Sequence, residues 1–234
     1  MDKRSVKLVV ISDFTCPWCF IGHQELLKAI AQCANLPVVF DLEYRPFVLH
    51  QTLPTDGLDK DEWHAKRFGR EKWQQAKQIV LAKGEEANIQ FSFGGPICVT
   101  LQAHRLMAKA YDIGGSSQQL KLTTLIFRAY CEEEQDISRD DVLADLAVQA
   151  EMMSKEKALA FLATDECLAK TQHQIAEARS KGVTGVPFTI IDGKWAVSGG
   201  QTAPVFVKIF SKLAQCSDSP PSQAGTPLPV AAAA

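Results

Sequence analysis

The chain has no long apolar run, no strong excess of either charge and no paired set of metal ligands. No stretch approaches the ~18–20 apolar residues that a transmembrane helix needs, so we expect none. The 25 Lys and Arg residues nearly balance the 27 Asp and Glu residues, which argues against nucleic acid as the main partner. The stretch that begins Met-Asp-Lys-Arg-Ser leads into a strand pattern and lacks the cleavage site of a signal peptide. We therefore expect a cytoplasmic protein that binds neither a membrane nor nucleic acid.

Cysteine is not scarce, but only two of the seven cysteines are close together. Cys16 and Cys19 form a Cys-Pro-Trp-Cys sequence, and the others are scattered singly at positions 33, 98, 131, 167 and 216. An odd, scattered count suits a reducing compartment better than a framework of disulfides. A structural zinc site would need a second Cys or His pair at comparable spacing, and the sequence has none. We expect no metal, which leaves an inert pair of buried thiols or redox chemistry.

The pattern around the cysteine pair favours redox chemistry. An apolar run at 6–11 stops shortly before the pair, and a helical pattern follows from Pro17 to about residue 34. A strand that delivers a Cys-x-x-Cys to the start of a helix is typical of a redox dithiol. Free backbone N–H groups and the positive end of the helix dipole favour the anion of the first sulfur, and Pro17 suits a first turn that needs no N–H. We expect Cys16 to attack and Cys19 to resolve.

Strand patterns occur at both ends of the chain, and helical patterns fill the middle. The opening predicts a strand at 5–12, a helix at 17–34 and a strand at 37–45; the end predicts strands at 188–191 and 195–198 and a helix at 202–214. A β-α-β start implies a parallel pair with a right-handed crossover. The two ends must then share one sheet, with the helical block inserted between them. The predicted fold class is α/β, a thioredoxin-like fold with a large all-helical insertion.

This layout divides the chain into a discontinuous thioredoxin-like domain at 1–58 and 182–216 and a helical insertion with its return helix at 59–181. Within the insertion, helices are expected at 59–83, 100–111, 116–132, 142–151, from 154 onward, and at 164–181. The segment from Ser138 to Asp141 resembles a capping box, and Asp192-Gly193 is a hairpin signal. Residues 217–234, rich in Ser, Pro and Ala, are expected to form a disordered tail.

A second constellation, Val186-Pro187, follows a glycine-rich turn and precedes the strand expected at 188–191. Taken alone it is compatible with an ordinary loop proline, since only ~5% of X–Pro bonds in folded proteins are cis. In a thioredoxin-like sheet, however, this loop lies opposite the start of the Cys-x-x-Cys helix. We therefore expect Pro187 to be cis and the backbone of Val186 to be presented to a peptide or thiol ligand.

Five segments spread along the chain carry a family resemblance. They are Asp13-Phe-Thr-Cys16-Pro-Trp-Cys19-Phe-Ile-Gly22, Arg45-Pro-Phe47, Ala103-His-Arg-Leu106, Gly182-Val-Thr-Gly-Val-Pro187-Phe and Ser198-Gly-Gly-Gln201. In this order they resemble the DsbA-like thioredoxin-domain family, and within it the FrnE-type branch of dithiol oxidoreductases. The resemblance covers about residues 5–215 and implies a thioredoxin fold with a helical insertion, an active-site dithiol and a cis-proline loop. Kappa-class glutathione transferases and hydroxychromene carboxylate isomerases are similar in layout and typically carry Ser where Cys16 stands.

The chain departs from the family pattern at three places. Pro17-Trp18 replaces the Pro-His of periplasmic DsbA, so the resemblance does not imply a strong oxidant. Val99-Thr100 stands where the family often has Asn-Thr, which leaves Thr100 as the polar candidate there. Gly200 stands where the family commonly has Ala, and we expect little consequence from this difference.

The predicted substrate-binding residues surround the dithiol. They are Pro17, Trp18, Val186, Pro187, Thr100 and His104. Trp18 is interpreted as an exposed, substrate-facing aromatic because it lies at the helix start. His104 and Arg105 have a plainer alternative, a packing histidine and a salt-bridged arginine. Trp63, Phe68 and Trp73 fall at near-helical spacing and are interpreted as the core of the insertion or as a cleft wall.

Three functions fit this sequence. The first is a thiol–disulfide oxidoreductase, in which Cys16 attacks the disulfide of a protein or of a small-molecule thiol and Cys19 resolves the mixed disulfide. The second is a glutathione-dependent transferase or isomerase acting on a small aromatic molecule, and the third is a redox-linked chaperone without turnover. We favour the first, with no tightly bound cofactor and with glutathione as a candidate co-substrate. The oligomeric state is left open, and a homodimer is one expected form.

Overall fold

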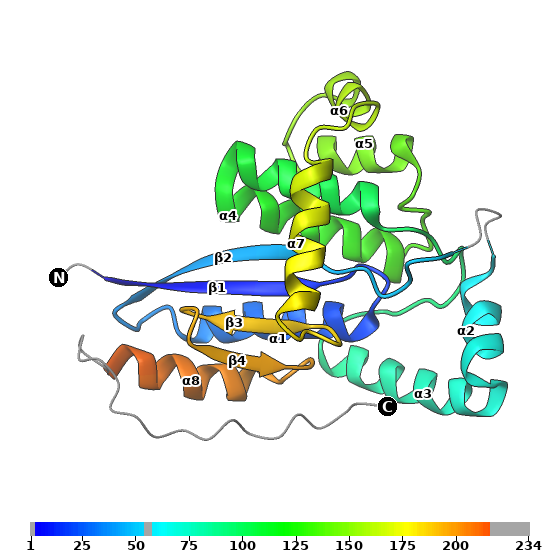
Figure 1. Ribbon diagram of the computed structural model, residues 1–234. Coiled ribbons are helices and arrows are strands. Elements are labelled where there is room, and N and C mark those ends of the chain that lie inside the picture. Colours follow the sequence, from blue (N-terminus) through cyan, green and yellow to red (C-terminus); the bar gives the residue numbers. More distant parts are fainter. Residues whose placement is uncertain (1–2, 54–57, 216–234) are drawn as a thin grey trace.

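A four-stranded sheet with the order β2-β1-β3-β4 organises the molecule (Figure 1). The computed structural model describes residues 3–53 and 58–215. The strands are β1 (Arg4–Ser12), β2 (Val38–Pro46), β3 (Phe188–Ile191) and β4 (Trp195–Ser198). Strand β1 pairs in parallel with β2 and antiparallel with β3, so it joins the two ends of the chain. The predicted thioredoxin-like α/β fold class is confirmed.

Strand β1 occupies the centre because its apolar side chains serve both faces of the sheet. Five of them are buried: Val6, Leu8, Val9, Val10 and Ile11. A continuous apolar run of this kind is typical of a strand covered on both sides. Helix α1 (Pro17–Gln32) makes the crossover to β2 and packs against α8 (Ala203–Gln215). In Figure 1 these two helices lie behind and below the sheet, and α7 (Leu168–Ser180) passes in front of it and packs against β2.

Helices fill the chain between β2 and β3, as predicted. They are α2 (Lys60–Phe68), α3 (Arg70–Glu86), α4 (Leu101–Cys131), α5 (Asp140–Gln149), α6 (Lys155–Leu162) and α7. Helix α4 packs on β2 and brings the insertion against the sheet. None of the described helices is long and apolar enough to cross a membrane. The predicted division into domains at 58/59 and 181/182 stays a prediction, and the predicted tail at 217–234 lies outside the described residues.

Glycines explain where the helices differ from the predicted ranges. The helix predicted at 59–83 is two helices, because Gly69 between them has a φ of +86°, a conformation that glycine adopts without strain. The helices predicted at 100–111 and 116–132 are both present as the two halves of α4, because Gly114 and Gly115 between them have non-helical φ and ψ values. The Gln119 side chain donates to the Met107 carbonyl across this break at 3.4 Å, so the second half turns back on the first and the predicted break is confirmed.

The turns and caps of the chain agree with the sequence in two cases and differ in one. Both residues of Asp192-Gly193 have positive φ values, 51° and 66°, and join β3 to β4 as the predicted hairpin. Ser154 caps α6 by accepting from the N–H of Lys157 at 3.4 Å. The predicted capping box at Ser138 is wrong. The Ser138 hydroxyl instead donates to Asp136 at 2.5 Å, and α5 begins two residues later without a side-chain cap.

An aromatic cluster lies between the dithiol helix and the insertion. The rings of Phe20 and Phe127 are stacked with centroids 5.2 Å apart, and Phe14 meets Phe127 edge-on at 5.1 Å. All three side chains are at most 2% exposed, and burying each stabilises the fold by about 1.5–3 kcal/mol. Because Phe14 and Phe20 flank the cysteine pair, this packing fixes the position of the dithiol.

Candidate functional site

The dithiol lies at the junction between β1 and α1. Cys16 is the N-cap of α1, with extended φ and ψ of −92° and 112°, and Pro17 occupies the first turn. The N–H of Cys19 donates to the carbonyl of Cys16 at 3.0 Å, which closes this turn. Cys16 is 6% exposed, Cys19 is 2% exposed, and both are free thiols. The predicted start of the helix at the cysteine pair is confirmed.

The loop before β3 approaches the first sulfur from the other end of the chain. The thiol of Cys16 donates to the carbonyl oxygen of Val186 at an Sγ–O distance of 3.5 Å. The bond between Val186 and Pro187 is cis, as predicted. The Val186 backbone therefore faces the Cys16 sulfur, in the position that the sequence analysis predicted for this loop.

A third segment, the turn after β4, closes against the same helix. A Cβ placed on Gly22 would lie 3.1 Å from Cγ of Pro187 and 3.3 Å from Cα of Gly200. A Cβ on Gly200 would lie 2.9 Å from the carbonyl oxygen of Trp18. The expectation that Gly at position 200 has little consequence is therefore wrong. Glycine at 22 and 200 lets three backbone segments meet behind the dithiol.

The two sulfurs differ in their electrostatic surroundings. Burial raises the pKa of Cys19 well above its usual value, and hydrogen bonding to Cys16 and the charge of Cys16 raise it further. The Ser12 hydroxyl and the Asp13 backbone oppose this shift without cancelling it. Cys19 therefore keeps its proton and offers it to the neighbouring sulfur. This arrangement disfavours negative charge on Cys19.

A buried carboxylate lies beside the dithiol and was assigned no role from the sequence. Asp13 is 1% exposed; its Oδ2 accepts from the N–H of Leu49 at 2.7 Å and from the Thr15 hydroxyl at 3.2 Å. Nε2 of His104 lies 3.5 Å from Oδ1 of Asp13. Thr100 is a further hydrogen-bond partner of this carboxylate. The sequence feature that could have revealed Asp13 is its position as an acidic residue directly after an apolar strand.

Two predicted substrate-binding residues belong to this carboxylate site. Thr100 and His104 are 2% and 1% exposed, and both contact Asp13. The structure brings them close to the dithiol loop but buries them below its surface. Their direct binding of substrate stays a prediction.

Comparison with known proteins identifies the fold family. The family model for the DSBA-like thioredoxin domain matches residues 7–211, most of the chain. This chain belongs to the DSBA-like thioredoxin domain family. The uncharacterized protein YwbO of Bacillus subtilis is 28% identical over 211 residues, covering 88% of this chain and 96% of that protein.

Solved structures share the architecture of this DSBA-like domain. The probable DsbA oxidoreductase of Streptomyces coelicolor is 24% identical with a TM-score of 0.80, covering 94% of each chain. The cytosolic disulfide reductase DsbM of Pseudomonas aeruginosa, solved with GSH, is 14% identical with a TM-score of 0.64. That comparison covers 90% of this chain and 100% of DsbM. At these identities the likeness shows the fold.

The surface of this DSBA-like domain at the dithiol is aromatic. Trp18 lies between the two cysteines in the first turn of α1 and is 36% exposed. Pro17 beside it is partly buried. The structure thus leaves Trp18 accessible at the site, and its contact with substrate stays a prediction.

Arg105 has a structural role that the sequence did not identify. It is 3% exposed and donates to the backbone carbonyls of Leu162, Thr164 and Glu166, with NH2 to Glu166 at 2.9 Å. These carbonyls belong to the last residue of α6 and to the connection between α6 and α7. Arg105 therefore ties this connection to α4, where a salt bridge or a place in the cleft had been expected.

The aromatic residues of α2 and α3 form a separate cluster. Trp73 is 6% exposed and stacks on His64 at 4.3 Å, whereas Phe68 is 50% exposed. Burial lowers the pKa of His64 to about 4. His50 lies edge-on to Trp63 at 4.5 Å. The prediction of an insertion core therefore describes Trp73 but not Phe68.

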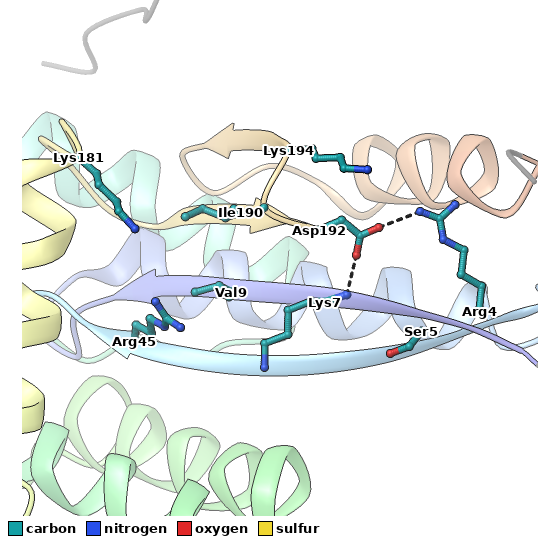
Figure 2. Close-up of a pocket in the computed structure, with 10 residues that line it drawn as sticks. Arg4, Ser5, Lys7, Val9, Arg45, Lys181, Ile190, Asp192 and Lys194 are labelled. Atoms are coloured by element: carbon teal, nitrogen blue, oxygen red, sulfur yellow. Dashed lines mark hydrogen bonds and ion pairs between the residues drawn. The ribbon is translucent and has the colours of Figure 1, made fainter. Parts of the chain in front are cut away.

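A shallow hollow of about 680 Å³ lies on the sheet of this DSBA-like domain, away from the cysteines (Figure 2). Its lining residues are Arg4, Ser5, Lys7, Val9, Arg45, Lys181, Ile190, Asp192, Gly193 and Lys194. Most of its cations are held by carboxylates. Arg4 contacts Asp192 at 2.9 Å, and Lys7 and Arg45 share Glu43 at 3.0 and 2.8 Å. The described residues contain no group of three or more His, Cys, Asp or Glu side chains placed to hold a metal ion.

Proposed function

We propose that this protein is a thiol–disulfide oxidoreductase in which Cys16 attacks and Cys19 resolves. One observation carries the proposal: Cys16 is the N-cap residue of helix α1, and its sulfur lies 3.5 Å from the Val186 carbonyl with the protonated Cys19 behind it. A disulfide that enters along the Val186 backbone would meet Cys16 before Cys19. Membership of the DSBA-like family supports this function.

The reaction follows from the order of the two sulfurs. The Cys16 thiolate attacks one sulfur of the substrate disulfide, forms a mixed disulfide and releases the other substrate sulfur as a thiolate. Cys19 then loses its proton, attacks Cys16 and releases the second substrate sulfur. The substrate gains two electrons and two protons, and the protein holds a Cys16–Cys19 disulfide. Two molecules of a small thiol reduce this disulfide and restore the dithiol.

The proposed reductant is glutathione, and the proposed compartment is the cytoplasm. The DsbM structure solved with GSH supports testing this thiol first. Trp18 also occupies the place where periplasmic DsbA has histidine, so the dithiol lacks the imidazole of that oxidant. The five sequence segments further support placement in the FrnE-type branch. The proposed substrates are disulfides of proteins or of small thiols.

Reduction of insulin by glutathione, followed by turbidity, tests this function. We expect Cys16→Ser to lose at least 100-fold of the rate and Cys19→Ser to accumulate a mixed disulfide with glutathione, detected by intact mass. Cys167→Ser is the matched control, since Cys167 is a partly exposed free thiol in another part of the chain. The proposal fails if Cys16→Ser keeps full activity. It also fails if Cys19→Ala turns over normally, because a dithiol mechanism needs both sulfurs.

A further inference from the structure

Asp13 and His104 form a buried pair directly below the dithiol loop. Each side chain is 1% exposed, and the 3.5 Å between Nε2 and Oδ1 is an ion-pair distance rather than a well-directed hydrogen bond. Among the described residues, neither ring nitrogen of His104 has a hydrogen-bond partner. Phe14 covers the imidazole with ring centroids 4.8 Å apart. The carboxylate is therefore the polar group that His104 faces.

The Asp13 carboxylate connects three segments that surround the dithiol. It accepts from Thr15 in the cysteine loop, from the N–H of Leu49 after β2 and from Thr100 at the start of α4. The Asp13 carbonyl also accepts from the N–H of Cys16 at 3.2 Å. Movement of this one residue would therefore move the backbone that carries the attacking sulfur.

The ionised form of this carboxylate depends on its neighbours. Burial acts to raise the pKa of Asp13, but contact with His104, its charge, the Leu49 N–H and Thr100 together lower it below the usual value. A buried carboxylate without such partners is strongly disfavoured. His104 is the one of these neighbours that can carry a full positive charge.

Other titratable groups face Asp13 from the surrounding elements. They are His50 after β2, Cys98 before α4, Tyr130 on α4 and Cys19 on α1. Burial lowers the pKa of His50, and burial raises the pKa of Cys98 to about 12 and that of Tyr130 above its usual range. These groups are neutral at pH 7, so the charge of Asp13 is balanced through His104.

We propose that His104 is a positioning residue that balances the buried charge of Asp13, and that this pair sets the pH range in which Cys16 reacts. The inference rests on the proposed function of the dithiol. Without His104, the Leu49 N–H and the Thr15 and Thr100 hydroxyls still hold the ionised carboxylate of Asp13, and its uncompensated charge opposes the negative charge that develops on the attacking sulfur. When Asp13 is also replaced by a neutral residue, no carboxylate remains to oppose negative charge on the Cys16 sulfur.

The pH dependence of Cys16 alkylation by iodoacetamide, followed by peptide mass spectrometry, tests the pair. We expect His104→Gln to raise the pH midpoint of alkylation by about one unit, which is a tenfold change in the thiolate fraction at a given pH below the midpoint. The double variant Asp13→Asn/His104→Gln should return the midpoint toward that of the wild type. If His104 only supports the packing, the midpoint of the double variant should be shifted at least as far as that of His104→Gln.

His23→Gln is the matched control. His23 is equally buried, lies on the dithiol helix and contacts the hydroxyls of Tyr44 and Thr124 instead of a carboxylate. We expect it to lose stability without moving the midpoint. Should His104→Gln fail to fold by circular dichroism, His104→Asn replaces the imidazole by a smaller neutral amide and should raise the midpoint in the same direction.

Two results would overturn the pairing. One is a midpoint in His104→Gln, or in His104→Asn where that variant replaces it, equal to that in His23→Gln. The other is a midpoint in the double variant that lies still higher than in His104→Gln. Alkylation of Cys16 needs no catalytic turnover. It therefore tests the role of the Asp13–His104 pair separately from the proposed oxidoreductase function. Absence of insulin reduction together with a shifted midpoint refutes the proposed function and leaves the pair supported.

Discussion

The hydroxyl of Tyr44 lies 2.6 Å from Nδ1 of His23, and this contact joins the helix that carries the dithiol to strand β2. The other ring nitrogen of His23 lies 2.9 Å from the hydroxyl of Thr124 on α4. His23 is 1% exposed, and burial lowers its pKa to about 3. One neutral imidazole therefore links the dithiol helix, the sheet and the insertion.

Removing the Tyr44 hydroxyl should destabilise the protein. In Tyr44→Phe, Nδ1 of His23 is left buried without a partner, which costs about 1–3 kcal/mol of the free energy of unfolding. Urea denaturation followed by circular dichroism measures this loss. Tyr111→Phe is the control, since its hydroxyl meets Lys7 at 3.0 Å at a partly buried position. Equal losses in the two variants would contradict a special role for the His23 contact.

Stability should fall as the pH drops from about 6.5 toward 4. Burial holds the pKa of His64 at about 4 and that of His23 at about 3 in the folded protein, against an ordinary value of 6.5. The unfolded chain takes up these protons first, so the stabilisation is complete above pH 6.5 and is lost as the pH falls toward the folded values. Each histidine contributes a slope of up to about 1.4 kcal/mol per pH unit.

The urea midpoint, measured at intervals from pH 8 to pH 4.5, checks this sign. We expect a plateau at the alkaline end and a smaller acid slope in His64→Gln than in the wild type. His173→Gln provides the comparison, because His173 lies exposed on α7. An acid slope in His64→Gln as steep as in the wild type would show that His64 does not carry the effect.

An alanine at position 200 should disturb the dithiol helix. Its Cβ would lie 2.9 Å from the Trp18 carbonyl, so backbone must shift, at a cost of about 1–3 kcal/mol. We expect Gly200→Ala to unfold at lower urea and to change the alkylation rate of Cys16. Gly185→Ala, in the loop before Pro187, is matched to it because its Cβ would meet no atom within 4 Å. If the two variants were equally stable, the close contact at Gly200 would be refuted.

Arg105 should control the order of the connection between α6 and α7. Arg105→Met removes the donors to three backbone carbonyls and leaves them unpaired, so we expect a loss of about 2–4 kcal/mol. Limited proteolysis should then cut the chain faster near residues 163–167. Arg128→Met, on the same helix with a side chain 55% exposed, should change neither stability nor cleavage. Unchanged cleavage in Arg105→Met would argue against this role.

The cysteine pair and the individual strands were predictable because they depend on local residue types, and the cis-proline loop became predictable once the order of strands and helices indicated a thioredoxin-like layout. Cys16 and Cys19 share one turn, and Val186-Pro187 directly precedes its strand. The Asp13–His104 contact was not predictable, because it depends on how α4 docks on the loop after β1. The consequence of Gly200 was also hidden, since a sequence does not say which backbone atom a missing Cβ would meet.

Helix breaks show the same limit. The pattern predicted one helix over 59–83, yet the positive φ of 86° at Gly69 divides this segment into α2 and α3. Ser138 has the residue type of a helix cap, yet Asp136 takes its hydroxyl. Whether such a hydroxyl caps a helix or bonds to a neighbouring side chain is decided by a single hydrogen bond, and the pattern of residues does not show which one forms.

The contact between Cys16 and Val186 spans 170 positions of the chain, and this has a consequence for synthesis on the ribosome. The reactive thiol leaves the ribosome long before the loop that covers it, by roughly 10–30 s at typical rates of elongation. During that interval strand β1 also lacks its partner β3. The nascent chain therefore presents an uncovered dithiol and a central strand with one edge unpaired, and the reducing state of the surroundings decides whether Cys16 reaches its finished site as a free thiol.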